Sequence, residues 1–223
     1  MMRRDEFEST LSNPLSYWSS KSKNEVGDLI NSKVGDMVGF DQRSPHHCYD
    51  LFNHSLHTVD GIVDPAPILL RVAAFFHDIG KPVVAMEKQG RLVFYGHAQK
   101  SAEMIPDTLK KMGYVTEELK EICFYIKHHD DFISWILPEE ENNYANKYMV
   151  KITEENIRRH IDVVNKKCSK DNFYPDKYIW KNLLNLCYAD VSAQAEVVFQ
   201  NGTIIDTQAH KLKKISTLQT SLN

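Results

Sequence analysis

The stretch 72-VAAFFHDIGKP-82 places a histidine and an aspartate directly after a run of apolar residues. A segment that is apolar on every side is typical of a helix at the centre of a bundle. Gly80 and Pro82 follow at once, and we expect Gly80 to adopt the left-handed conformation that ends such a helix. Because an unpaired buried charge is costly, His77 and Asp78 require either a partner or a chemical role.

Helical patterns extend on both sides of this stretch. Apolar residues recur at three- and four-residue steps from Leu51 to Val63, and Pro65 prevents continuation. The helices that we expect cover residues 3–11, 24–33, 49–63, 68–78, 98–111, 116–128, 153–166, 175–199 and 207–218, the last of them basic and amphipathic. β-Branched and aromatic residues around 88-KQG-90 predict a short hairpin or a loop within 83–96, and 139-EEENN-143 is expected to be a solvated loop. The sequence therefore predicts an all-α protein with one minor β-hairpin.

Composition limits the classes of partner. The 223 residues are 42% hydrophobic and carry a formal net charge of −3. Binding of extended nucleic acid needs clustered Lys and Arg, so this balance argues against it but allows a small phosphorylated ligand. The sequence has no apolar run of about 20 residues, as a membrane span would need, and 1-MMRRDEFEST-10 lacks the apolar core of a secretory signal. We therefore expect a cytoplasmic protein, and the oligomeric state stays open.

Cysteine and histidine contribute differently to the interpretation. Cys48, Cys123, Cys168 and Cys187 are far apart and form no CxxC pair, so we expect them to be reduced and mostly buried. Six of the ten histidines fall between His46 and His97. This concentration makes histidine the more informative residue type.

Several histidines and aspartates lie at the ends of expected helices or within apolar helical segments. They are His54, His77, Asp78, His97, His128, His129 and Asp190. Imidazole and carboxylate groups projecting inward from several helices are how a bundle builds a metal cluster. Each residue alone is a weak signal, because a lone buried histidine is usually a core residue. The combination is a much stronger one.

The order and local context of these residues resemble the HD superfamily of metal-dependent phosphohydrolases. The similarity covers roughly residues 40–200 and is greatest to the HD domain attached to some bacterial tRNA nucleotidyltransferases. The stretches that carry it are 41-DQRSPHHCYDLFNHS-55, 54-HSLHTVD-60, 71-RVAAFFHDIGKP-82, 94-FYGHAQKSAE-103, 126-IKHHDD-131 and 188-YADVSAQ-194. The resemblance implies an HD-domain helical bundle over 41–223 with a C-terminal helix, preceded by a helical extension over 1–40.

The resemblance also implies roles for single residues. His54, His77, Asp78 and Asp190 would form the primary metal site. His97 and His129 would hold a second ion, which makes Asp78 the bridging carboxylate. The family spacing favours His129 over His128, although the register leaves both open, as it leaves open whether one ion or two is bound. His57 is better interpreted as a residue outside the ligand set, and His46 and His47 as substrate contacts at the mouth of the site.

The chemistry that this site would perform follows from its ligand types. Imidazole and carboxylate ligands suit Fe, Mn, Co, Ni or Zn better than Mg. Such an ion lowers the pKa of bound water from about 15.7 towards roughly 7, and the resulting hydroxide attacks phosphorus. Asp78 and Lys81 are the residues to which we assign catalysis, with Lys81 neutralising charge on the phosphoryl group. Arg43, Lys100 and Lys127 are further candidates for that role, each more simply explained as a surface cation.

Two departures and two alternatives bear on the function. The forty residues before the match have no room for a nucleotidyltransferase head, so we expect a stand-alone HD domain that does not add nucleotides to tRNA. The GYP signature of the cyclic-di-GMP phosphodiesterase branch is missing. The favoured function is a phosphomonoesterase or phosphodiesterase acting on a nucleotide or other small phosphoester. The alternatives are a di-iron oxygenase of the inositol-oxygenase type, which uses the same ligand order, and a non-catalytic regulatory domain that binds a nucleotide.

Overall fold

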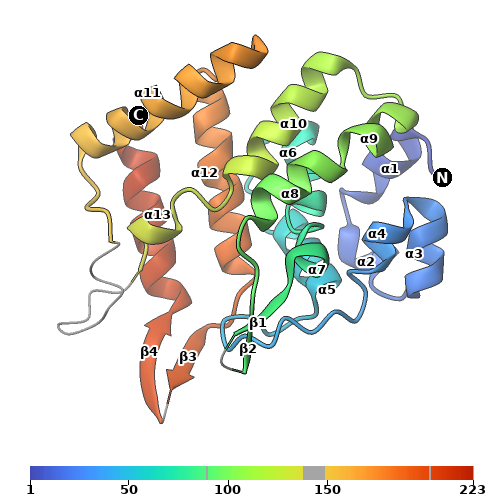
Figure 1. The fold of residues 1–223 in the computed structure, drawn as a ribbon, viewed down its shortest axis with the longest axis horizontal. Coiled ribbons are helices and arrows are strands. Elements are labelled where there is room, and N and C mark those ends of the chain that lie inside the picture. Colours follow the sequence, from blue (N-terminus) through green and yellow to red (C-terminus); the bar gives the residue numbers. More distant parts are fainter. Residues whose placement is uncertain (89, 138–148, 201, 223) are drawn as a thin grey trace.

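A computed structural model describes residues 1–88, 90–137, 149–200 and 202–222 of the chain (Figure 1). The helices of the first half are α1 (Arg4–Thr10), α2 (Pro14–Trp18), α3 (Lys23–Leu29), α4 (Ser32–Gly35), α5 (Leu51–Asp60), α6 (Ile68–Phe76), α7 (Lys81–Val84), α8 (His97–Met104) and α9 (Pro106–Met112). The remaining helices are α10 (Thr116–His128), the short η1 (Ile133–Trp135), α11 (Glu154–Cys168), the short η3 (Ser169–Asp171), α12 (Lys177–Ser192) and α13 (Gln208–Ser221). The strands are β1 (Met86–Lys88), β2 (Arg91–Val93), β3 (Val197–Gln200) and β4 (Thr203–Thr207). The predicted all-α class is confirmed.

Helix α6 is the centre of the bundle, as its apolar sequence predicts. Every residue from 72 to 80 is buried, and α6 packs against α5, α10 and α12. These three neighbours surround it in Figure 1. Burying an apolar side chain contributes about 1.5–3 kcal/mol, so α6 is fixed by contacts on all sides. The segment that follows α6 is therefore held in a rigid frame.

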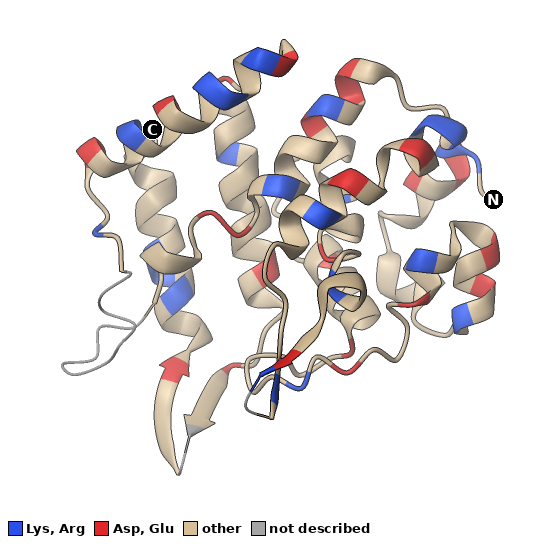
Figure 2. Cartoon of the chain, viewed as in Figure 1, with Lys and Arg blue, Asp and Glu red and all other residues tan. Residues whose placement is uncertain are grey.

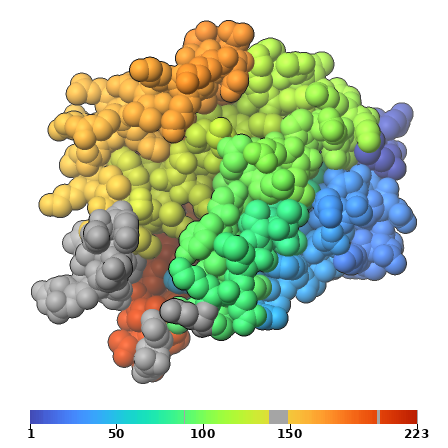
Figure 3. All heavy atoms as spheres, viewed as in Figure 1, coloured from blue at the N-terminus to red at the C-terminus, as the bar shows by residue number. Residues whose placement is uncertain are grey.

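The N-terminal helices share this core. Phe7 of α1 and Trp18 of α2 are fully buried, with ring centroids 5.1 and 5.3 Å from that of Phe75. Arg4 also forms an ion pair with Glu118 of α10 at 2.7 Å. In Figure 3 the N-terminal residues lie directly against the helices of the middle of the chain. Residues 1–40 thus cover one side of the core that also supports α6.

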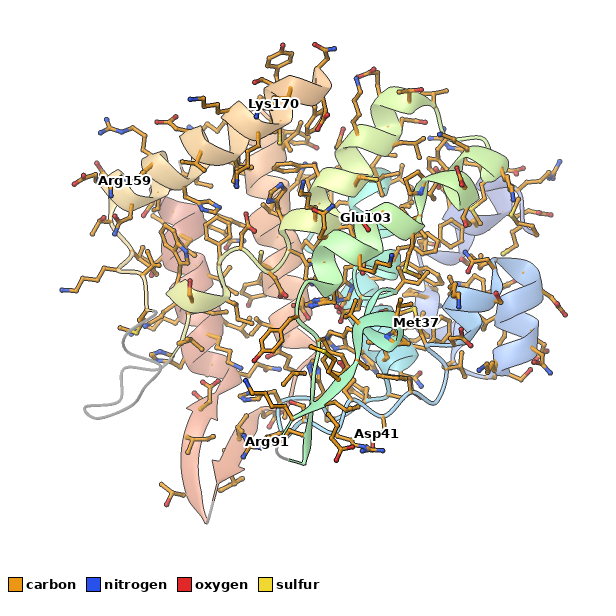
Figure 4. All side chains as sticks on the ribbon, in the orientation of Figure 1. Met37, Asp41, Arg91, Glu103, Arg159 and Lys170 are labelled. Carbon is orange, nitrogen blue, oxygen red and sulfur yellow. The ribbon has the colours of Figure 1, made fainter. Side chains whose placement is uncertain are left out.

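Two antiparallel hairpins lie at the same end of the molecule. The hairpin β1–β2 is the one that the sequence predicts, whereas β3–β4 is not predicted. The 41–50 loop lies beside β1–β2, where Arg43 faces Glu87 at 3.6 Å, and Figure 4 labels Asp41 and Arg91 at this end. Arg159 and Lys170 extend outward from α11 and η3, away from the hairpins.

Several expected boundaries are wrong for identifiable reasons. The helix expected over 98–111 is two helices, because Pro106 lacks the N–H that would continue α8 and instead opens α9. The helix expected over 175–199 ends at Ser192, and its last residues form β3, since Val197 and Phe199 find strand partners in β4. The 139-EEENN-143 run lies outside the described residues.

Two other expectations need correction or qualification. The four cysteines are free, but only Cys187 is buried, while Cys48 is exposed and the others are half-buried. Among the described residues, no helix combines the length and apolar character that crossing a membrane requires.

Gly80 does not adopt the left-handed conformation that we expected. Its φ of −77° and ψ of −20° are right-handed, so the helix end does not explain the glycine. The reason is a close approach to α8: a Cβ on Gly80 would lie 2.7 Å from the His97 carbonyl oxygen and 2.8 Å from the Ser101 amide nitrogen. Gly80 also donates its own N–H to Ser101 Oγ at 2.9 Å. The glycine therefore allows the segment after α6 to touch the start of α8.

Gly80→Ala is expected to lower the free energy of unfolding by about 1–3 kcal/mol, the cost of overpacking against backbone atoms that cannot yield. Urea denaturation measures this loss. Gly27→Ala is the matched control, because its Cβ would meet only Ser32 Cα at 3.6 Å, and alanine in a helix is favoured over glycine by about 0.5–1 kcal/mol. Equal stability of the two variants would contradict the close approach of α8.

Candidate metal centre

Six side chains predicted as ligands converge beside the C-terminal end of α6. They are His54 of α5, His77 and Asp78 after α6, His97 at the start of α8, His129 after α10 and Asp190 of α12. His54, His77 and Asp78 are each at most 1% exposed, and His129 is 4% exposed. The Asp190 side chain is 14% exposed. The cluster is thus almost wholly removed from solvent.

One group of ligand atoms surrounds the Oδ2 side of Asp78. His77 Nε2 lies 3.2 Å and His54 Nε2 lies 3.6 Å from Asp78 Oδ2. Asp190 Oδ1 lies 2.9 Å from His54 Nε2 and 3.8 Å from His77 Nε2. Ligands about 2.0–2.1 Å from one ion stand roughly 3 Å apart. These separations therefore match those of ligands on a common cation.

A second group surrounds the Oδ1 side of the same carboxylate. Asp78 Oδ1 lies 3.1 Å from His97 Nε2 and 3.6 Å from His129 Nε2, and the two imidazole nitrogens are 3.2 Å apart. Asp130, which the sequence analysis did not nominate, joins this group at 3.1 Å from His97 Nε2 and 3.6 Å from His129 Nε2. Asp78 thus presents one oxygen to each group. Its position between them is that of a bridging carboxylate.

The tautomer of each histidine is fixed by a backbone carbonyl. His77 Nδ1 lies 2.7 Å from Ala74 O, His97 Nδ1 lies 3.0 Å from Phe94 O, and His129 Nδ1 lies 2.6 Å from Ile126 O. His54 Nδ1 lies 3.3 Å from Ala193 O. A carbonyl oxygen only accepts hydrogen bonds, so Nδ1 carries the proton in all four rings. The Nε2 atoms are left as lone-pair donors for a metal ion, which is the usual arrangement of metal-binding histidines.

The cluster lacks the positive charge that its geometry requires. Among the described residues, the buried atoms without a hydrogen-bond partner include His54 Nε2, His77 Nε2 and Asp78 Oδ1. His97 Nε2 and His129 Nε2 would face each other lone pair to lone pair if both rings were neutral. Such orphaned buried acceptors are costly, and a cation at their centre satisfies them together. The residues therefore fit one or two divalent ions of the kind that imidazole and carboxylate bind.

The charged groups of the cluster shift one another's pKa values. Burial alone would raise the pKa of Asp78, but its contacts with His77, Lys81 and His129 hold it well below its ordinary value. Burial alone would lower the pKa of His129, but Asp130, Asp78 and Asp190 raise it to about 9. A proton on His129 thus offsets part of the negative charge of these three carboxylates. A metal ion that binds His129 has to displace this proton.

Lys81 lies beside the bridging carboxylate. Its Nζ is 2.7 Å from Asp78 Oδ2 and donates to Gln42 Oε1 at 2.9 Å. The residue is 6% exposed. Burial alone would lower its pKa, but its ion pair with Asp78 and the nearby charge of Asp190 raise it. Lys81 therefore stays charged and fixes one oxygen of Asp78. Gln42, which the sequence did not single out, orients the ammonium group.

The adjacent histidines His128 and His129 point in different directions. His128 Nδ1 lies 2.8 Å from Asp131 Oδ2, and the ring lines a cavity of about 400 Å³ on the other face of α10. Asp131 also contacts His160 Nε2 at 3.1 Å. Only His129 reaches the cluster. The structure therefore favours His129 as the ligand, which agrees with the family spacing.

The remaining candidates lie at different distances from the cluster. His47 packs against His54 with ring centroids 5.0 Å apart, whereas His57 stacks on Tyr49. Lys100 faces Glu103 on the surface, and Lys127 lines the cavity that holds His128. Arg43 is exposed beside Glu87. Of these residues, His47 stands closest to the ligands.

A cavity of about 210 Å³ opens from the cluster. His129, Asp130 and Asp190 line one part of it, and His46 and His47 line another. A small molecule in this cavity would therefore meet the cluster at His129, Asp130 and Asp190. That His46 and His47 contact substrate stays a prediction.

Asp130 has a sequence signal that we did not use. It follows His129 just as Asp78 follows His77, and both His-Asp pairs end a helix. In each pair the histidine Nδ1 bonds to the carbonyl three residues earlier, and the aspartate that follows the histidine also lies in the cluster. The repeated His-Asp pair could therefore have identified Asp130.

His129→Ala is expected to lower the bound metal by at least half, because it removes a ligand from the second group. His128→Ala is the matched neighbour and should keep the full complement. Elemental analysis of both purified variants after reconstitution with Mn²⁺ measures the difference. Equal metal content in the two variants would contradict the assignment.

Metal binding is expected to release a proton from His129 below about pH 9. The apparent affinity for Mn²⁺ should therefore rise with pH from about 6 to 9, by up to roughly tenfold per unit, and level off above that range. Titration calorimetry at pH 7 in buffers of different ionisation enthalpy counts the protons released. The count should be unchanged in His128→Gln, and a pH-independent affinity would show that His129 holds no proton to displace.

Comparison with known proteins places this geometry in a family. A 109-residue region is 32% identical to the CC-adding tRNA nucleotidyltransferase of Thermus thermophilus and covers 47% of this chain and 24% of that protein. A 133-residue region is 28% identical to the A-adding tRNA nucleotidyltransferase of Deinococcus radiodurans and covers 56% of this chain and 30% of that protein. The chain thus spans less than a third of the length of these relatives. The HD domain model matches residues 47–167, more than half of the chain, and the protein therefore belongs to the HD domain family.

Proposed function

We propose that this chain is a metal-dependent phosphohydrolase that acts on a nucleotide or another small phosphoester. The observation that carries the proposal is Asp78, whose two oxygens face two separate groups of imidazole and carboxylate atoms. Two ions about 3.5–4 Å apart can clamp the attacking and leaving oxygens of an in-line displacement at phosphorus. The proposal also agrees with the phosphohydrolase activity associated with the HD superfamily.

The ligand set divides between the two sides of Asp78. His54, His77 and Asp190 would hold one ion, and His97, His129 and Asp130 would hold the other. Bound divalent ions supply a hydroxide nucleophile near neutral pH and neutralise charge on the phosphoryl oxygens. The carbonyl hydrogen bonds to Nδ1 orient every imidazole with Nε2 toward the cluster, so metal binding would require loss of the His129 proton but no change in ring orientation.

Lys81 would act through Asp78. Its buried ammonium group pairs with Asp78 Oδ2 and with Gln42, so it keeps the carboxylate ionised and fixes its rotamer. Two of its three N–H donors are thus engaged, so the predicted phosphoryl contact of Lys81 would have to come from the third. We therefore propose that it chiefly positions the bridging carboxylate.

A nucleotide is favoured over extended nucleic acid. Lys and Arg are interspersed with Asp and Glu along α11 rather than gathered on one basic face (Figure 2). The two relatives are both tRNA nucleotidyltransferases. A nucleotide is therefore a natural choice within the small phosphoesters that this site would accept.

The test is hydrolysis of a panel of phosphomonoesters and phosphodiesters by the full chain reconstituted with Mn²⁺, Co²⁺, Ni²⁺ or Mg²⁺. We expect turnover with a transition metal and loss on chelation. Asp78→Asn should lower kcat/KM by about 10³-fold or more, because it weakens both groups and the charge stabilisation that bound metal provides is worth several kcal/mol. Lys100→Ala, on the surface beside Glu103, is the control and should keep wild-type activity.

The same samples separate the alternatives. Tightly bound iron with O₂ uptake and no phosphate release would favour the oxygenase. Metal and nucleotide binding without turnover of any ester would favour a regulatory domain. Either result would overturn the phosphohydrolase proposal.

A further inference from the structure

The cavity beside the metal centre has two chemically different ends. At one end His129, Asp130 and Asp190 present ligand atoms. The other end lies beside β4 and α13, which contribute Asp206 and Lys211, and beside the segment that follows α12, which contributes Gln194. These three residues lie outside the 47–167 match to the family model. The far end is therefore built by segments that follow the region matched by the family model.

Lys211 and Asp206 form a buried pair at the far end. Lys211 Nζ lies 2.8 Å from Asp206 Oδ2, and the two residues are 7% and 6% exposed. Lys211 also donates to Gln194 Oε1 at 3.1 Å and lies 3.4 Å from His46 Nδ1. The lysine charge is thus cancelled by a partner and shared among three acceptors. The far end consequently does not attract a second phosphate, and it suits a neutral polar group.

Lys211 also fixes the orientation of the Gln194 amide. An ammonium group only donates hydrogen bonds, so the amide atom beside it is the oxygen. The Nε2 atom of Gln194 is then the amide's remaining polar group, and it can only donate. A ligand in this cavity would therefore be recognised through an acceptor on its polar edge.

The walls between the two ends are apolar. Phe132 and Ile136 line one side, and Val191 and Ile215 line the other. All four are at most 5% exposed in the folded chain. Apolar and aromatic walls that lead to a hydrogen-bonding edge are how proteins hold a flat base removed from a stack. The volume of about 210 Å³ is below the roughly 300–1,000 Å³ of pockets for drug-sized ligands.

We infer that this cavity is the subsite for the nucleoside part of a mononucleotide, with its phosphate at the metal centre and the edge of its base against Gln194. Gln194 is then a specificity-determining residue, and Lys211 positions it. The inference rests on the proposed function for the phosphate end. It further limits the substrate to phosphoesters that contain a single nucleoside, and it excludes oligonucleotides and sugars with a second phosphate.

Binding tests this inference without requiring turnover. The probes are the methylene phosphonate analogues of adenosine 5′-monophosphate, uridine 5′-monophosphate and ribose 5-phosphate, titrated by calorimetry into the full Mn²⁺-loaded chain. We expect at least one nucleotide analogue to bind at least tenfold more tightly than the ribose analogue, which has the same sugar and phosphonate but no base. Fructose 1,6-bisphosphate and a dinucleotide should bind no more tightly than the ribose analogue.

Two substitutions at Gln194 sharpen the test. Gln194→Leu removes the amide, while Gln194→Glu keeps an oxygen for Lys211 and replaces the donor with a second carboxylate oxygen that carries negative charge. Both should lower the advantage of the nucleotide analogue about tenfold, the scale of one hydrogen bond, and change the ribose analogue less than twofold. Gln219→Leu, another half-buried glutamine but outside this cavity, should change neither ratio. Metal content should be unaltered in all three variants.

The outcomes separate this inference from the proposed function. Equal affinity for the nucleotide and ribose analogues, or an unchanged ratio in both Gln194 variants, would overturn the nucleoside subsite even if the chain hydrolyses other esters. Base-dependent binding that is lost in both variants would support the subsite even if the ester panel shows no hydrolysis, and the proposed function alone would then fail. A purely structural role of Gln194 would change stability but not the ratio of affinities.

Discussion

The structure depends on a set of buried acceptor atoms that face one another. Four imidazole Nε2 atoms and three carboxylates occupy one centre, and the nearest of these atoms are 2.9–3.2 Å apart. Without a cation these atoms repel, and the free energy of folding has to offset that repulsion. The apolar surroundings of α6 provide the offset, because they fix the segment after the helix from every side. The stable core therefore tolerates the unfavourable centre, and a cation bound there would remove the repulsion between the acceptor atoms.

Helix ends are the device that places the ligands. His77 follows the last residue of α6, His129 follows the last residue of α10, and each ring bonds back to the carbonyl three residues earlier. The last carbonyls of a helix lack intrahelical partners, so they are free to bind an imidazole N–H. The same hydrogen bond satisfies the helix end and selects the metal-binding tautomer. In both cases the next residue is an aspartate that lies in the cluster.

The sequence was most informative where a residue type has only one common structural use. The apolar run before His77 correctly predicted a central helix, and the resemblance to the HD superfamily implied six side chains that do converge. Gly80 misled because glycine has two uses, a left-handed turn and a close approach, and the second depends on α8, which lies elsewhere in the chain. The β3–β4 hairpin was missed because its pattern also continues that of α12. Gln42 and Gln194 carry no local signal, since their roles depend on lysines distant in sequence.

The chain divides the work of the site between two regions. The residues matched by the family model contribute every side chain of the cluster except Asp190. This aspartate lies on α12 beyond the match and contacts His54. Helix α12 therefore carries Asp190 of the cluster and Val191 of the cavity wall, and Gln194 follows the end of the helix. Because Asp190 and Val191 are adjacent on one helix, a shift of α12 would move a cluster residue and the cavity wall together. We therefore expect changes in α13 or β4, which contact this cavity without reaching the cluster, to be the route by which substrate selectivity changes while metal binding is kept.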